Sequence, residues 1–302
     1  MKVPWEDARC IVCLEPAMFT EEHVIPAALG GRLTCRFLCA ACNSSLGHKI
    51  EGQAKSDPTI QLLVRKLAER VPQLASQLLE GQVYVSSGPG GASRGRVKGG
   101  EFVVRSERLA DDSLILPTPI AAKSLRRMLE RDKHDPAAIS KALTLFELAP
   151  ENTRIAISEN VDVVKWSIES IQPSLDGPLL NLTAPLKTAY EFLALHLNTA
   201  IYESAPALTA ARQALTGEPI DPTHLLVERL HAPEAKPFHG LLFEGSEPYT
   251  TIQIRLLGQL GFRVHFKTLS VGGPRFVYTH NLTSNEEHVA LADAGLQVTP
   301  AK

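Results

Sequence analysis

Apolar residues recur at helical spacing along several stretches of the chain. Over residues 58–71 the apolar side chains fall on one face and charged side chains on the other, and Pro58 suits the first turn of a helix. The same pattern, together with start signals such as Asp221-Pro222, predicts helices over 119–131, 136–147, 184–199 (long and buried) and 222–230.

Alternation of apolar and polar residues marks a second set of segments. Residues 249–256 and 262–267 alternate around a turn that contains glycine, as expected for an antiparallel hairpin, and 275–278 supplies a third strand. Shorter strands are expected at 83–85, 102–104 and 154–157. This mixture predicts an α+β fold in which a larger domain is built on an antiparallel sheet.

The segment over residues 86–100 is rich in glycine and in basic residues. It joins two expected strands, so we expect a flexible basic loop there. Such a loop suits a phosphate backbone, and it also suits an ordinary solvated hairpin. The sequence leaves both interpretations open.

Composition narrows the class of protein. The chain has 302 residues, of which 44% are hydrophobic and 21% charged, which is typical of a globular protein of one or two domains. A formal net charge of -2 excludes a basic field over the whole molecule, so any contact with nucleic acid must be local. The sequence shows neither a membrane-length apolar run nor the hydrophobic core of a signal peptide, and we expect a cytoplasmic protein.

The cysteines carry the first chemical signal. All five lie in the first 42 residues, which is unlike a secreted disulfide framework. Four of them form two Cys-x-x-Cys pairs that suit one closed tetrahedral zinc site, although small buried cysteines can also cluster without a metal. The expected ligands of this structural Zn²⁺ are Cys10, Cys13, Cys39 and Cys42. Cys35 is left over and has no assigned role.

A second motif lies between and after the two pairs. Phe-Thr-Glu-Glu-His-Val-Ile-Pro runs from Phe19 to Pro26, a Gly-Gly loop follows, and Asn43 comes directly after the second pair. This order resembles the HNH (ββα-metal) endonucleases, which have an acidic residue followed by His-x-Ile-Pro, then a Gly-Gly loop, then a helix that starts at Cys-x-x-Cys-Asn. The likeness is to their four-cysteine branch, which includes phage endonuclease VII, and it spans roughly residues 8–55. It implies a zinc-stapled ββα module that hydrolyses phosphodiester bonds.

The residues of this motif have the chemistry that such hydrolysis needs. A base must activate water, and a cation must neutralise charge on the phosphate. His23 is the candidate base, because imidazole accepts a proton near neutral pH. Glu22 and Asn43 offer the oxygen ligands that Mg²⁺ or Mn²⁺ prefers, and the resemblance implies that they bind the catalytic ion, with His48 as a further candidate. Residues 22 and 23 point to opposite sides in a regular strand, so we expect the strand to bend or end there.

Some positions depart from the family pattern. Glu22 stands where the family more often has Asp, and Asn43 stands where His is common. The middle asparagine of the family, which braces the loop that carries the base, is missing between residues 34 and 38. Three nearby cations either help to grip the nucleic-acid backbone or are ordinary surface charges: Arg32, Arg36 and Lys49.

Together these observations predict three parts: an HNH nuclease module with structural zinc (1–56), a helix with a basic connecting segment (57–100), and an α+β accessory domain for target recognition, regulation or assembly (101–302). We expect a metal-dependent DNA endonuclease of the kind used in bacterial or phage restriction, defence or mobile elements. RNA as a substrate and cleavage by a homodimer stay open. The alternatives are a zinc-binding nucleic-acid adaptor without activity, and a nuclease held inactive until the C-terminal domain senses a ligand.

Overall fold

The computed structural model describes residues 1–79, 181–231, 236–246, 248–272 and 275–292. It also describes the shorter segments 83–87, 93–98, 101–104, 107–108, 114–116, 118–148, 153–157, 163–167 and 170–173. The chain divides into two units: the first joins Met1–Leu79 with Gly177–Lys302, and the second is Glu80–Asp176. These units differ from the three parts expected from the sequence. Sequence order does not show that residues after 176 pack against residues before 80. Among the helices that the structure describes, none has the length and apolarity to cross a membrane.

The first 56 residues form a small sheet followed by a helical segment. β1 (Lys2–Val3), β2 (Phe19–His23) and β3 (Thr34–Cys39) lie in the order β1-β3-β2, with β2 antiparallel to β3 and the 3-10 turn η1 (Ala27–Leu29) between those two strands. α1 (Ala40–Leu46), the π-helical segment η2 (Gly47–Glu51) and α2 (Gly52–Ser56) follow directly. Cys39 is the N-cap of α1, because its sulfur accepts a hydrogen bond from the Cys42 backbone N–H at 3.3 Å. This is the strand-strand-helix order expected of a ββα module.

The helix expected over 58–71 is divided in two. α3 (Pro58–Lys66) starts as predicted, with Asp57 Oδ1 accepting a hydrogen bond from the Ile60 backbone N–H at 2.9 Å. A second helix, α4 (Pro72–Leu79), follows after a turn. Pro72 has no backbone N–H and disfavours a helical conformation in the residue before it, so one helix cannot continue through this point. The predicted end of the first helix was therefore wrong.

The long helix expected over 184–199 is confirmed as α7 (Thr183–Leu197), which is followed by η3 (Asn198–Tyr202) and α8 (Pro206–Thr216). An antiparallel sheet of six strands comes next, in the order β12-β15-β14-β13-β16-β17. Its strands are β12 (Leu225–His231), β13 (Phe238–Ser246), β14 (Tyr249–Leu256), β15 (Leu260–Phe266), β16 (Arg275–Asn281) and β17 (Glu287–Ala292). The expected hairpin is confirmed as β14 and β15.

One expectation in this region needs correction. Residues 222–230 are not a helix: Asp221 Oδ1 accepts a hydrogen bond from the Thr223 N–H at 2.8 Å in a turn, and the chain then enters β12. Pairing of β12 with β15 along its whole length outweighs the local helix signal. The third strand expected at 275–278 is confirmed as β16, which joins the same sheet by pairing with β13 and β17.

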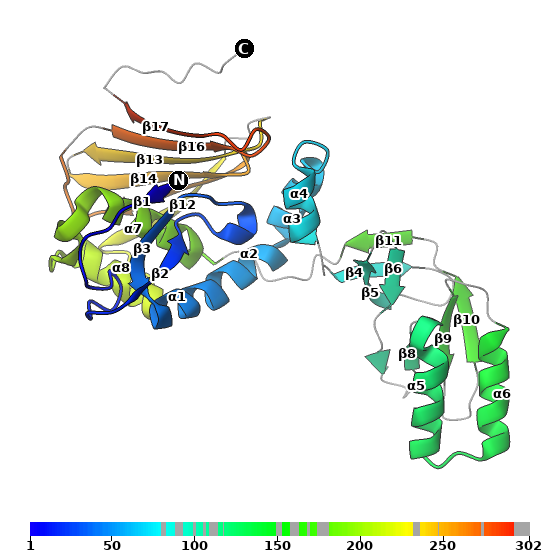
Figure 1. Ribbon diagram of the computed structural model, residues 1–302. Coiled ribbons are helices and arrows are strands. Elements are labelled where there is room, and N and C mark those ends of the chain that lie inside the picture. The colour runs from blue at the N-terminus through cyan, green and yellow to red at the C-terminus, as the bar shows by residue number, and fades with distance from the viewer. Residues whose placement is uncertain are drawn as a thin grey trace. The chain divides into compact units, whose positions relative to one another are not determined.

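Helix α7 occupies the centre of the first unit (Figure 1). It packs against β13, β14 and β15 of the large sheet and also against η2 of the N-terminal segment. Its residues from Ala184 to Ala194 are all buried, because neighbours cover the helix around its circumference. One hydrophobic core therefore contains side chains from both segments of this unit, for example Phe37 and Ile60 from the first segment and Phe192 from the second.

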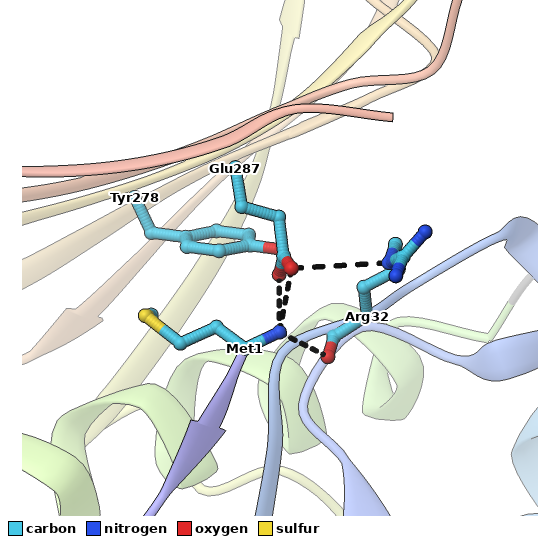
Figure 2. A network of polar contacts seen from close by, with 4 residues as sticks. All are labelled: Met1, Arg32, Tyr278 and Glu287. Carbon is cyan, nitrogen blue, oxygen red and sulfur yellow. Dashed lines mark hydrogen bonds and ion pairs between the residues drawn. The ribbon is translucent and has the colours of Figure 1, made fainter. Parts of the chain in front are cut away.

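A polar network also joins the two segments of this unit (Figure 2). The Met1 ammonium forms an ion pair with Glu287 Oε2 at 2.6 Å and donates a hydrogen bond to the Arg32 carbonyl oxygen at 3.1 Å. Arg32 Nε lies 3.8 Å from Glu287 Oε2, and the Tyr278 hydroxyl donates to Glu287 Oε1 at 2.8 Å. Arg32 thus lies beside β17 with a half-exposed side chain, and its suggested contact with a nucleic-acid backbone stays a prediction.

The second unit contains two small sheets and a pair of helices. One sheet has the order β11-β4-β5-β6, formed by β4 (Val83–Ser87), β5 (Ser93–Lys98), β6 (Glu101–Val104) and β11 (Ser170–Pro173). The other has the order β10-β9-β8-β7, formed by β7 (Glu107–Arg108), β8 (Leu114–Leu116), β9 (Thr153–Ile157) and β10 (Val163–Ser167). The helices expected over 119–131 and 136–147 are confirmed as α5 (Thr118–Arg131) and α6 (Pro136–Glu147).

The basic segment over 86–100 is only partly a loop. Residues 93–98 form β5, which pairs with β4 on one side and β6 on the other, and the expected strands at 83–85 and 102–104 lie in those neighbours. Two sets of backbone hydrogen bonds stabilise a strand whose Gly and Arg residues gave no strand signal. The parts of the predicted loop at 88–92 and 99–100 lie outside the described residues.

Candidate functional site

The four predicted zinc ligands come together at one point. Their sulfur atoms all lie within 4.8 Å of one another, and Cys13 Sγ is 3.9 Å from Cys39 Sγ. Tetrahedral zinc with Zn–S bonds of about 2.3 Å requires sulfurs about 3.8 Å apart. The first pair lies in the turn before β2, and the second spans the end of β3 and the start of α1. The donor set therefore fits a structural metal such as zinc.

The environment of Cys39 favours a thiolate. Burial disfavours its ionised form, but hydrogen bonds from the Cys42 backbone N–H and from neighbouring thiols outweigh burial and lower the Cys39 pKa. A sulfur at a helix N-terminus is favoured as an anion by the helix dipole as well. Thiolates are the form that binds metal.

Cys35 stands outside this cluster. It is fully buried on β3, where it pairs with Glu22 of β2, and burial raises the pKa of its thiol to about 12. A neutral thiol in an apolar setting behaves as a small core residue. Its place outside the cluster agrees with the four ligands expected from the two Cys-x-x-Cys pairs.

Strand β2 carries the predicted base at its last residue, His23. The register between β2 and β3 shifts between Thr20 and Glu22, so the strand is irregular just before the base, as expected. The Gly-Gly loop follows: Gly30 has a φ of 84°, and a Cβ on Gly31 would lie 1.9 Å from the Ile25 carbonyl oxygen. Glycine is required at Gly31 for this close approach of backbone to backbone.

Glu22 lies in a buried ion pair that the sequence did not predict. Its Oε1 accepts a hydrogen bond from Lys187 Nζ of α7, and the side chains of Glu22 and Lys187 are 6% and 1% exposed. Lys187 also forms an ion pair with Glu191 at 3.1 Å, and it donates to the His23 carbonyl oxygen at 2.8 Å. Burial opposes the charge of Lys187, but the carboxylates of Glu191 and Glu22 outweigh burial and raise its pKa.

A sequence signal for this cluster was present, although its partner on β2 was not evident. Lys187 and Glu191 are oppositely charged residues at positions i and i+4 within an otherwise apolar stretch of helix. A buried helix that keeps such a pair must satisfy both charges internally.

Asn43 reaches from α1 back to β2. Its Nδ2 donates to Thr20 Oγ1 at 2.8 Å and to the Glu21 carbonyl oxygen at 3.0 Å. A carbonyl oxygen only accepts hydrogen bonds, so the amide nitrogen must face β2 and Oδ1 lies on the other branch of the amide. Asn43 thus braces the strand that carries His23 and keeps an oxygen suited to a hard cation.

The other candidates are placed differently. His48 and Lys49 are exposed on η2. Arg36 Nη2 donates to the Phe19 carbonyl oxygen at 2.7 Å, so it supports β2. In the part of the chain that the structure describes, the cysteine cluster is the one group of three or more His, Cys, Asp or Glu side chains close enough to share an ion. His48 and Glu22 are therefore not joined in such a group.

Glu21, two residues before His23, carries an exposed carboxylate. It forms an ion pair with Lys2 at 3.0 Å, and its side chain is 50% exposed. The hydrogen bond from Lys2 is the main reason that its pKa lies below the usual value, with smaller contributions from His23 and Arg36. The sequence interpretation placed the ligand at Glu22, whereas the structure gives Glu21 the more accessible carboxylate.

Comparison with known proteins identifies one region of the chain. Residues 10–59 match the family model of the HNH endonucleases. No curated protein and no solved structure matches the chain. This match supports a resemblance to the HNH family. The closer likeness to phage endonuclease VII stays a prediction. With its four-cysteine cluster, its β2–β3 hairpin and α1, the segment over residues 10–59 is an HNH endonuclease-type module.

Proposed function

We propose that the protein is a metal-dependent nuclease that hydrolyses phosphodiester bonds, with DNA as its substrate. The observation that supports this most strongly is the coincidence of the HNH family match with a motif strand that carries His23 and is braced at Thr20 and Glu21 by Asn43 of the following helix. Nucleic acid is the substrate class that the HNH match implies.

His23 is proposed as the general base. It accepts a proton from water as the water oxygen attacks phosphorus, and the bond from phosphorus to the leaving oxygen breaks. Mg²⁺ or Mn²⁺, when bound, supplies a Lewis acid beside the phosphate. Asn43 offers Oδ1 as a ligand, because its Nδ2 is engaged by β2. Glu22 offers Oε2, because Oε1 is engaged by Lys187.

The cysteine cluster is proposed to hold Zn²⁺ in a structural role. The four thiolates would join the turn before β2 to the end of β3 and the start of α1. A closed Cys₄ shell leaves no open position for substrate, so it stabilises geometry and takes no part in the reaction.

One observation favours a second candidate, a zinc-binding nucleic-acid adaptor without activity. Glu22, the expected metal ligand, is buried and bound to a buried lysine. A carboxylate held in this way is a weaker cation ligand than an exposed one. The adaptor would bind nucleic acid and leave it intact.

The two candidates are separated by incubating the full-length, zinc-loaded protein with supercoiled plasmid and Mg²⁺ or Mn²⁺, beside an EDTA control and a binding assay in Ca²⁺. The nuclease predicts nicked or linear plasmid that EDTA abolishes, and the ratio of the two products distinguishes single-strand from double-strand cleavage. Retarded but intact plasmid with every cation would support the adaptor.

A further inference from the structure

We propose that Lys187, on α7, is a positioning residue for the base His23, so that the nuclease site extends beyond the HNH match into the C-terminal segment. This inference rests on the proposed function. Lys187 lies far outside residues 10–59, and no part of the HNH motif implies it.

Lys187 Nζ has three polar partners, two through hydrogen bonds and one through an ion pair. An ammonium group has three N–H donors. Lys187 Nζ contacts Glu22 Oε1, the His23 carbonyl oxygen at 2.8 Å and Glu191 Oε2 at 3.1 Å. Two of these three partners belong to the last two residues of β2. A buried cation with three acceptors fixes them in one geometry, because any displacement would leave a charge unpaired in the interior.

The strand that carries the base is held from two helices. Asn43 of α1 binds Thr20 and the Glu21 carbonyl oxygen, and Lys187 of α7 binds the next two residues, Glu22 and His23. Each of the four consecutive residues 20–23 thus has a hydrogen bond to a helix in addition to the β2–β3 pairing. Catalytic side chains need such support, because an error of about 1 Å in position can cost on the order of a hundredfold in rate.

The same face of α7 also contacts the turn that contains Cys10 and Cys13. Tyr190 lies three residues after Lys187, and its hydroxyl donates to the Ile11 carbonyl oxygen at 2.6 Å, inside the first cysteine pair. Residues at positions i, i+3 and i+4 share one face of a helix. Lys187, Tyr190 and Glu191 therefore present one polar face of α7 to the module and connect its metal-binding turn to its base strand.

The test compares full-length, zinc-loaded variants in steady-state cleavage of a DNA duplex with Mn²⁺, at a temperature well below every unfolding midpoint. Lys187→Met removes the ties to β2. Leu193→Ala, on the same buried helix, is the control for destabilisation alone. Positioning predicts that kcat of Lys187→Met falls on the order of tenfold or more while KM for DNA stays within about twofold, and that Leu193→Ala keeps the wild-type kcat.

Lys187→Met leaves two buried carboxylates without a cation, which can destabilise the fold. A second variant therefore distinguishes loss of positioning from loss of folding. Lys187→Met combined with Glu191→Met removes one charge of each sign and still lacks the ties to β2. Its kcat should fall as in the single variant. Hydrogen exchange of the peptide over residues 19–25 should be faster in both Lys187 variants than in Leu193→Ala.

The outcomes separate the two proposals. A wild-type protein that cleaves, with Lys187 variants that match its kcat and its exchange over 19–25, would overturn the positioning role and leave the nuclease intact. A wild-type protein that cleaves nothing with any divalent ion would overturn the proposed function itself, and the positioning role with it.

Discussion

Lys187 Nζ donates a hydrogen bond to the backbone carbonyl of His23 at 2.8 Å, although the two residues are 164 positions apart in the sequence. The HNH-type module is thus not held by its cysteine cluster alone. The strand that carries His23 is bound by α7, which follows the second unit in the chain and packs against the large sheet. This arrangement gives the C-terminal segment a direct part in the geometry of the site.

The cysteine cluster predicts a sharp difference between two cysteine variants. Cys13→Ala should reduce bound zinc from about one equivalent to nearly none and lower the unfolding temperature, because three thiolates do not close the shell. Cys35→Ala should keep about one equivalent, because Cys35 is a buried core residue outside the cluster. Metal analysis of the purified proteins measures both. Equal zinc content in the two variants would contradict the ligand assignment.

Asn43 is expected to act through both ends of its amide. Asn43→Ala should cost about 1–3 kcal/mol of stability, since two hydrogen bonds to β2 are lost, and should raise the Mn²⁺ concentration for half-maximal cleavage. Asn43→Asp should destabilise in a similar way but keep the wild-type Mn²⁺ requirement, because it keeps an oxygen ligand. If both variants need the same Mn²⁺ concentration as the wild type, Asn43 is only a brace.

We expect the burial of His196 to make the protein less stable in mild acid. Its ring lies 4.0 Å from that of Phe243 and 4.8 Å from that of Phe276, measured between centroids, and burial lowers its pKa to about 4. An unfolded histidine titrates near 6.5, so the unfolded state gains a proton first and stability falls as the pH drops from about 6.5 towards 4. His196→Leu should flatten this dependence in urea titrations at several pH values. An unchanged slope would assign the acid sensitivity to other groups.

The second unit should be removable. The core of the first unit contains side chains from both of its segments, so replacing residues 80–176 with a Gly/Ser linker should give a folded, zinc-loaded protein that unfolds cooperatively. A truncation after residue 100 should lose that fold, because it removes Lys187, Tyr190 and the large sheet. Loss of zinc from the internal deletion would contradict the assignment of the units.

Faster cleavage by the internal deletion would indicate autoinhibition, and an equal rate would count against it.

The cysteine cluster was predictable because its signal is local. Two Cys-x-x-Cys pairs restrict where four sulfurs can lie, and the same short segment contains His23 and Asn43. Long amphipathic segments such as 136–147 were equally clear, since their periodicity needs no partner. These features depend on neighbours a few residues away.

The features that sequence reasoning missed depend on distant partners. The helix signal at Asp221 was overridden by pairing of β12 with β15, and β5 formed between two strands despite its glycine. The burial of Glu22 depends on Lys187, and the sequence around Glu22 does not indicate a cation 165 residues away. Tertiary context decides such cases, because ladder hydrogen bonds and buried ion pairs require that the chain has already folded.

The most direct test of the proposed site is single-turnover cleavage of end-labelled DNA by the wild-type protein and by His23→Ala, at equal zinc content and with Mg²⁺ or Mn²⁺. Loss of a general base costs about 10²- to 10⁴-fold in rate. We therefore expect metal-dependent cleavage that falls by at least a hundredfold in the variant, while its zinc content and unfolding temperature stay unchanged. Equal rates from the two proteins would contradict His23 as the base and, with it, the proposed site.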